Sequence, residues 1–178
     1  MRLTRSALPI FAFAISLFVT FSARAESAAS ADASAGPPGW DKLVTLSGKW
    51  EGVGHEGAKS LPVTTEFHFV ADKSVLMNTL AAGTPHEMIT MFHDDGGTLM
   101  ATHYCAMHNQ PRLYSEPAKA ANQLSFLFKD STNIGPGDAH MKRLVITFVD
   151  ATHHLEDWSA VDEEGKESVK RFEFHRKQ

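Results

Sequence analysis

Apolar and polar residues alternate along most of the chain between Gly48 and Arg176. In the segment 61–71, for example, Val63, Phe67 and Phe69 stand at odd positions with mostly polar residues between them. A period of two is typical of strands that bury one face. A series of such strands must pair or close its edges, most simply as an up-and-down barrel. The pattern therefore predicts an all-β fold, an antiparallel up-and-down barrel of about ten strands.

Ten segments carry this alternation, and glycine-containing turns such as 94–97 and 163–166 separate some of them. The expected strands are 48–55, 61–71, 75–82, 86–93, 98–105, 111–116, 123–129, 140–150, 153–161 and 167–176.

A different pattern precedes the strands. Trp40, Leu43, Val44 and Leu46 follow a helical spacing, which predicts a short N-terminal helix that caps one end of the barrel. Together with the strands it forms one expected domain, 40–178. Residues 26–39 are small, polar or Gly and Pro, and we expect a flexible linker there.

Residues 1–25 have the features of a secretory signal peptide. Arg2 and Arg5 precede an apolar stretch, 7–21, and Ala23-Arg24-Ala25 resembles a cleavage site. The apolar stretch is short for a membrane span, and an uncleaved anchor is the alternative. We therefore expect a periplasmic or secreted protein with no stable membrane span after cleavage.

Charge and cysteine content narrow the function classes. Cleavage would leave 14 basic and 21 acidic residues, a net charge of −7 with neutral histidines. Nucleic-acid binding is not expected, because it needs a basic surface. Cys105 is the only cysteine, so it cannot form an internal disulfide and is buried, metal-bound or an intermolecular partner.

The opening Gly48-Lys49-Trp50 resembles the Gly-x-Trp motif of lipocalins and related calycin-type barrels. This resemblance implies that a basic residue of the last strand, Arg171 or Arg176, packs over the tryptophan. The longer string 48–54 also resembles the opening of nitrobindin-type haem barrels.

Three further motifs, 83–88, 102–105 and 109–112, together with Asp157-Trp158, resemble an uncharacterised family of exported bacterial proteins with a lipocalin-like barrel. The resemblance covers most of 43–176 and implies no established activity. Its members tend to have Glu where this chain has Asp157.

The turn at 94–97 predicts how two strands pair. The simplest register sets Phe92 opposite Leu99 and His86 opposite Cys105. One face then has no carboxylate and is the expected lumen face; it carries His86, Met88, Thr90, Phe92, Leu99, Ala101, His103 and Cys105.

In this register His86, His103 and Cys105 converge at one end of the barrel. Two imidazoles and a thiolate suit zinc or copper, and His108 in the next loop can add a fourth ligand. The alternative is structural: a buried histidine hydrogen-bonded to the backbone or to Tyr104, beside a small buried cysteine.

Two other chemistries stay open at this stage. Haem would need a proximal histidine, for which His153, His154 and His175 are the candidates by position. Cys105 with a neighbouring histidine could form a thiolate–imidazolium pair, although no Gly-x-Ser-x-Gly motif is present.

The leading prediction is a barrel without catalysis that binds a small, mostly apolar or amphipathic molecule. The alternative prediction is a metal- or haem-binding barrel with zinc or haem as its cofactor. The leading prediction expects no cofactor. An apolar outer face with Ile89 and Met91 makes a homodimer a further hypothesis. The expected ligand-contacting residues are Trp50, His86, His103, Tyr104, Cys105, Asn109, Arg112 and Trp158.

Overall fold

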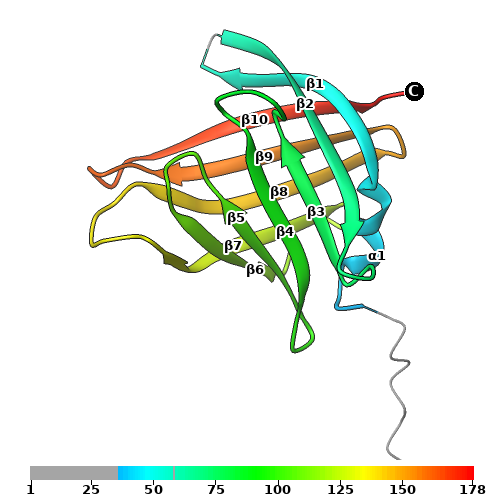
Figure 1. Ribbon diagram of the computed structural model, residues 1–178, viewed down its shortest axis with the longest axis horizontal. Coiled ribbons are helices and arrows are strands. Elements are labelled where there is room, and N and C mark those ends of the chain that lie inside the picture. The colour runs from blue at the N-terminus through cyan, green and yellow to red at the C-terminus, as the bar shows by residue number, and fades with distance from the viewer. Residues whose placement is uncertain (1–35, 58) are drawn as a thin grey trace, which may run out of the picture. The chain divides into compact units, whose positions relative to one another are not determined.

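The computed structural model describes residues 36–57 and 59–178, and these form a closed antiparallel barrel of ten strands (Figure 1). Each strand pairs with the next along the chain, and β1 pairs with β10 to close the ring. The prediction of an all-β up-and-down barrel is confirmed. The predicted signal peptide, 1–25, and the linker residues 26–35 lie outside the described residues.

The elements agree closely with the expected segments. A short helix α1 (Trp40–Leu43) runs into a 3-10 turn η1 (Val44–Leu46). The strands are β1 (Gly48–Glu56), β2 (Lys59–Val70), β3 (Val75–Leu80), β4 (Met88–Asp95), β5 (Thr98–Tyr104), β6 (Gln110–Glu116), β7 (Gln123–Thr132), β8 (His140–Asp150), β9 (His153–Val161) and β10 (Glu167–Arg176).

The predicted register between β4 and β5 is wrong by two residues. Phe92 lies opposite Ala101 rather than Leu99, and Thr90 lies opposite His103. The reason is the turn, which consists of Gly96 and Gly97 with φ of 63° and 89°, and a two-residue hairpin loop favours glycine at such angles. A shift of two keeps each side chain on its face, so the predicted lumen face still holds for the residues within the strands.

The start of β4 also differs from the expected one. Residues 82–87 form turns: the Glu87 carboxylate accepts a hydrogen bond from the Gly83 amide at 2.6 Å, and the Thr84 hydroxyl donates to the carbonyl of Ala81 at 2.8 Å. These local bonds compete with strand pairing. As a result His86 is an exposed loop residue and not a member of the strand.

The core fills the barrel interior. Phe67, Phe92 and Phe126 are buried. The ring centroid of Phe92 lies 6.5 Å from that of Phe67 and 5.6 Å from that of Phe126. Burial of each phenylalanine contributes roughly 1.5–3 kcal/mol. Gly54 of β1 makes room for another ring, because a Cβ there would lie 2.9 Å from the Phe172 side chain.

One end of the barrel is covered by α1 and η1 (Figure 1). Leu43 and Leu46 are fully buried in the main core cluster, and the carbonyl of Leu46 accepts a hydrogen bond from the Trp50 indole at 2.7 Å. The helical segment predicted at 40–46 is therefore present and packs onto the barrel core.

Arg176 is the basic residue that packs over Trp50. Its guanidinium lies 4.1 Å from the ring centroid and donates hydrogen bonds to the carbonyls of Ser47 and Thr45 at 2.8 and 2.6 Å. The other candidate, Arg171, forms a bidentate ion pair with Asp157 at 2.6 and 2.7 Å. The register explains the choice, because Trp50 and Arg176 are direct partners across β1 and β10.

We predict that Arg176→Met lowers the free energy of unfolding by about 2–4 kcal/mol, because it removes a cation–π contact and the hydrogen bonds to three backbone carbonyls, those of Thr45, Ser47 and Ala151. Urea denaturation measures the change. The matched control is Arg171→Met on the same strand, whose exposed ion pair is worth at most about 1 kcal/mol. Equal losses in the two variants would contradict the role of Arg176.

Candidate functional site in the barrel lumen

Strand β9 directs three polar or amphipathic side chains into the lumen, His154, Glu156 and Trp158. They stand two residues apart, so they share one face of the strand, and all three are buried, with Glu156 only 2% exposed. The Glu156 carboxylate accepts a hydrogen bond from the Trp158 indole at 3.0 Å and lies 3.3 Å from Nε2 of His154. The carboxyl group is thus held inside the barrel between an indole N–H and an imidazole nitrogen.

His103 of β5 extends this arrangement on another wall of the barrel. Its ring centroid is 4.6 Å from that of Trp158, and its Nδ1 is 2.9 Å from the Thr90 hydroxyl. Thr90 and His103 meet because they are direct partners across β4 and β5. We call Thr90, His103, Trp158, Glu156 and His154 the lumen row.

The far end of the lumen row lies among aromatic rings. His154 stands edge-on to Trp50, with centroids 4.4 Å apart, and stacks on Phe174 at 5.2 Å. The row therefore runs from the β4–β5 wall to the aromatic core beside Trp50.

Two imidazole nitrogens of the row, Nε2 of His103 and Nδ1 of His154, are buried without a hydrogen-bond partner among the described residues. An unpaired buried polar group is costly and marks a place where a ligand group or a water can bind. Burial lowers the pKa of His103 from its ordinary 6.5 to about 4. Its imidazole is therefore neutral near pH 7, and Nε2 can accept or donate a hydrogen bond without adding charge.

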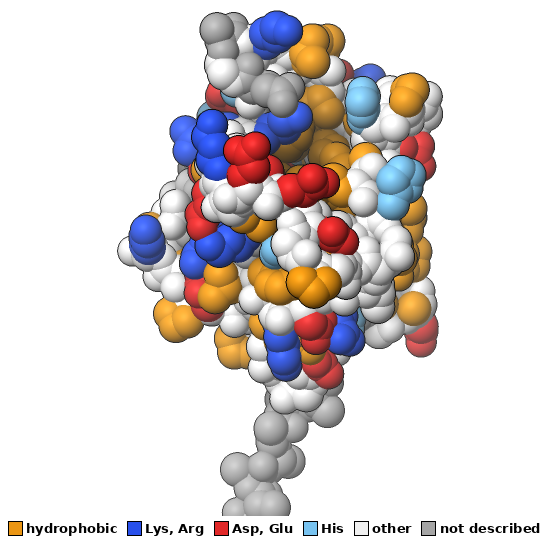
Figure 2. Space-filling view, turned by 90° about the vertical axis from the view of Figure 1, so that its left-hand side faces the viewer, with side chains coloured by type: hydrophobic (Ala, Val, Ile, Leu, Met, Phe, Trp, Pro, Cys, Tyr) orange, Lys and Arg blue, Asp and Glu red, His pale blue; other side chains and the backbone are white. Residues whose placement is uncertain are grey.

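The end of the barrel away from α1 is hollowed. Figure 2 looks at this end and shows hydrophobic side chains at the bottom of a hollow, with charged side chains beside it. Met88 and Met141, at the starts of β4 and β8, and Val63 of β2 are half-buried and pack against the core. His103 stands one residue before the end of β5, so the lumen row begins close to this opening.

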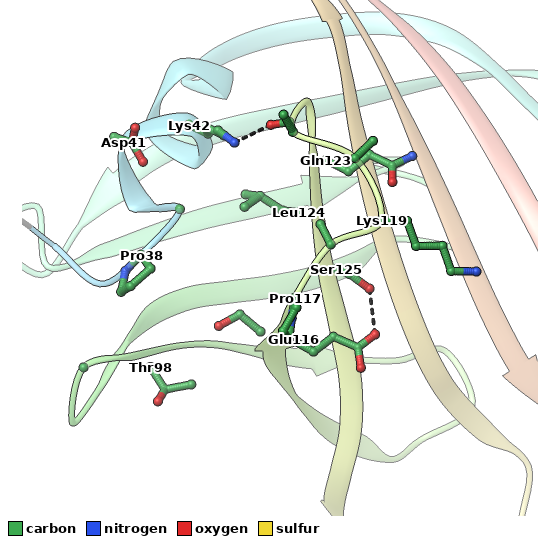
Figure 3. Close-up of a pocket in the computed structure, with 16 residues that line it drawn as sticks. Pro38, Asp41, Lys42, Thr98, Glu116, Pro117, Lys119, Gln123, Leu124 and Ser125 are labelled. Atoms are coloured by element: carbon green, nitrogen blue, oxygen red, sulfur yellow. Dashed lines mark hydrogen bonds between the residues drawn. The ribbon is translucent and has the colours of Figure 1, made fainter.

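A second hollow lies outside the lumen, between α1 and the loop before β7 (Figure 3). The Lys42 ammonium donates to the carbonyl of Ala121 at 2.5 Å, and the Ser125 hydroxyl donates to Glu116 at 2.9 Å. The first bond joins the helix to the loop, and the second joins β7 to β6. The lumen differs from this hollow, because it contains buried ring nitrogens without a partner among the described residues.

The structure separates the predicted metal ligands. His103 and Cys105 follow one another on the same wall and are buried, whereas His86 and His108 are exposed in loops. In the described part of the chain these four do not form a group with ligand atoms within 4.8 Å of one another. The two-residue correction of the register and the turns at 82–87 are the physical reasons.

The other predicted ligand contacts divide between interior and surface. Trp50, Trp158 and Asn109 are buried, and Asn109 donates to the carbonyl of Ala139 at 2.8 Å. Tyr104 is 49% exposed, and Arg112 forms a bidentate ion pair with Asp130 at 2.5 and 2.8 Å. Arg112 is therefore already engaged by a carboxylate of this chain.

Sequence reasoning missed Glu156, placed Thr90 on the lumen face without a role, and considered His154 only as a haem ligand. The available signal was the spacing of His154, Glu156 and Trp158, which places all three on the face of the buried tryptophan. The signal was weak because neither face of β9 is purely apolar in sequence.

Burial also decides the state of Cys105. It raises the pKa of this thiol, although backbone amides of the following loop partly oppose the shift. A thiol with a raised pKa stays protonated and is a poor nucleophile.

None of the described helices is long and apolar enough to span a membrane.

Comparison with known proteins extends the description of the fold. No family model matches the sequence, and a search of curated proteins found no match. The barrel is similar to the crystal structure of Rv2717c from M. tuberculosis, with a TM-score of 0.53 and 13% identity over 81% of this chain and 100% of that one. It is also similar to a protein of unknown function, NPUN_R4044 of the DUF3598 family, from Nostoc punctiforme PCC 73102. That match has a TM-score of 0.53 and 9% identity, and it covers 76% of this chain and 48% of the other. At such identities the likeness establishes a shared barrel fold.

We predict that His103 makes the protein less stable in acid. The His103 imidazole binds a proton below about pH 6.5 in the unfolded chain but only near pH 4 in the folded chain. Its contribution to the free energy of unfolding is therefore complete above pH 6.5 and is lost as the pH falls to about 4. The loss from this group is about 3 kcal/mol.

Urea denaturation between pH 4 and 7.5 tests this prediction with His103→Gln, which retains a hydrogen-bonding group for Thr90. The variant should lose this part of the pH dependence, whereas His86→Gln, at an exposed loop position, should behave as the parent. The prediction would be refuted if the free energy of unfolding of His103→Gln falls in acid as steeply as that of the parent.

Proposed function

We propose that the barrel binds a small, largely apolar molecule that enters through the end away from α1. The single observation that supports this most is the buried Nε2 of His103, which has no partner among the described residues and belongs to a residue one position before the end of β5. An apolar site with a few placed polar groups is the usual form of a small-molecule pocket. The apolar part of the ligand would contact Val63, Met88 and Met141, and its polar group would reach His103.

The charges of the lumen row define the class of ligand. His103 is neutral near pH 7, and the carboxyl group of Glu156 lies behind Trp158, so the part of the row nearest the opening offers no positive charge to an anion. A neutral hydroxyl or amide can exchange a hydrogen bond with Nε2, whereas a carboxylate would be desolvated without a counter-ion. The proposed ligand is therefore a neutral amphipathic molecule rather than a fatty-acid anion.

We further propose that the protein acts after export, in the periplasm or outside the cell, as a lipocalin-like binding protein without catalysis. The support is the basic, apolar and small-residue succession of residues 1–25, together with the opening Gly48-Lys49-Trp50. The raised pKa of the Cys105 thiol favours binding over nucleophilic chemistry.

Ligand preference is tested with 1-decanol and decanoate, which share a chain and differ in the charge of the head group. We predict that the protein binds 1-decanol at least about tenfold more tightly at pH 7, which corresponds to about 1.4 kcal/mol. Intrinsic tryptophan fluorescence can follow the titration, because Trp158 contacts His103. Stronger binding of decanoate, or no uptake of either compound, would overturn the proposal.

A pair of tryptophan substitutions tests the place of binding. Val63→Trp fills the hollow at the open end and should weaken 1-decanol binding by about tenfold or more, whereas Val169→Trp adds the same ring on an exposed site of β10 and should not. Native mass spectrometry and an absorption spectrum of protein from its own host complete the test. A co-purified neutral amphiphile supports the proposal, and a Soret band would instead favour a haem barrel.

A further inference from the structure

Strands β9 and β10 carry a second cluster of polar side chains, His153, Glu173 and His175. His153 and His175 are direct cross-strand partners, and their rings are stacked with centroids 4.4 Å apart and planes 22° apart. Glu173 precedes His175 by two residues, so it lies on the same face of β10. One imidazole nitrogen or carboxylate oxygen from each of the three residues lies within 4.8 Å of those of the other two.

The cluster faces away from the lumen. Its residues on β10 alternate with Phe172 and Phe174, which are buried in the core. This alternation turns Glu173 and His175 to the outside of the barrel, where the His175 side chain is 61% exposed. His175 also lines an open hollow beside β1 and β2, together with Glu51 and Thr64, so a solvated ion can reach it.

The distances are close to those of a metal site. Oε1 of Glu173 lies 3.0 Å from Nε2 of His153 and 3.8 Å from Nε2 of His175. Ligand atoms around a tetrahedral Zn²⁺ with bonds of about 2.0–2.1 Å are roughly 3.4 Å apart. The two observed separations lie on either side of this value, and the exposed His175 side chain can adjust by rotation about its χ angles.

The Nε2 atom of His153 also points to a missing ligand. This atom is buried and has no hydrogen bond of normal geometry among the described residues, although Glu173 is near. A buried ring nitrogen of this kind can be satisfied by coordination to a cation.

We propose that His153, Glu173 and His175 bind one divalent transition-metal ion, Zn²⁺ or Cu²⁺, with solvent completing the coordination. Two imidazoles and one carboxylate suit these ions, whereas Mg²⁺ and Ca²⁺ prefer oxygen ligands. The three side chains project from two hydrogen-bonded strands, so their backbone positions are fixed, and binding requires rotation of the exposed His175 ring out of its stack on His153. The site is separate from the lumen and does not depend on the ligand proposed above.

The neighbouring charges are compatible with this site. Glu51 of β1 lies opposite His175 in the register and adds a second carboxylate nearby. The Lys177 ammonium is 3.6 Å from Glu51 and partly offsets that charge, so the cation would meet a surface of slightly negative potential.

The test is calorimetric titration of the full untagged chain, freed of metal by a chelator, with ZnCl₂, CuCl₂ and MgCl₂. We expect saturable binding of one Zn²⁺ or Cu²⁺ per chain and no binding of Mg²⁺. His175→Ala and Glu173→Gln should each weaken Zn²⁺ binding by about tenfold or more, since loss of even an outer-shell partner costs 10–100-fold.

His93→Ala is the matched control, because it removes a histidine from the outer face of β4, a strand that is not adjacent to β9 or β10, and it should leave the affinity unchanged. Circular dichroism verifies that each variant is folded. If His175→Ala does not fold, Glu173→Gln still tests the site, because glutamine has nearly the same shape as glutamate. Absence of saturable Zn²⁺ and Cu²⁺ binding, or an affinity unchanged in both cluster variants, would overturn the proposal.

Discussion

The pairing of β1 with β10 is the interaction on which the rest of the structure depends, because it closes the sheet into a barrel. Arg176 reinforces it by covering Trp50 and bonding to the carbonyl of Ser47, a residue 129 positions earlier in the chain. Closing so long a loop costs only slightly more entropy than closing a short one, since the cost grows with the logarithm of length. Without this closure, both sheet edges would be exposed and the lumen would be open to water.

Closure has consequences for every polar group inside. In the enclosed interior, the indole of Trp158 and the imidazole of His154 hold Glu156, and burial keeps His103 neutral. On an open sheet the same side chains would be hydrated, and His103 would keep its ordinary pKa. The chemistry of the lumen row is thus a property of the closed barrel, and its free nitrogens are the positions at which a bound molecule can form hydrogen bonds.

Strands β9 and β10 show how a period of two separates two chemistries on one pair of strands. Inward positions carry His154, Glu156 and Phe174, and outward positions carry His153 and Glu173. The inward set meets aromatic rings in a low-dielectric space and suits a neutral ligand. The outward set meets solvent and suits a hydrated cation. His153 and His154 are therefore adjacent in sequence but lie in different environments.

The sequence by itself determined the elements and their faces. Alternation, turn glycines and the helical spacing at 40–46 are local properties, so the ten strands, the short helix and the inward orientation of Phe92 and His103 followed from them. Only the tertiary structure decided which residues meet across strands. The angles at Gly96 and Gly97 shifted a register by two, the turns at 82–87 removed His86 from the wall, and the β1–β10 pairing selected Arg176 over Arg171. The burial of Glu156 and the assembly of the histidine cluster were likewise decided by the tertiary structure. The surroundings of a side chain depend on strands that are distant in sequence and come close only in the closed barrel.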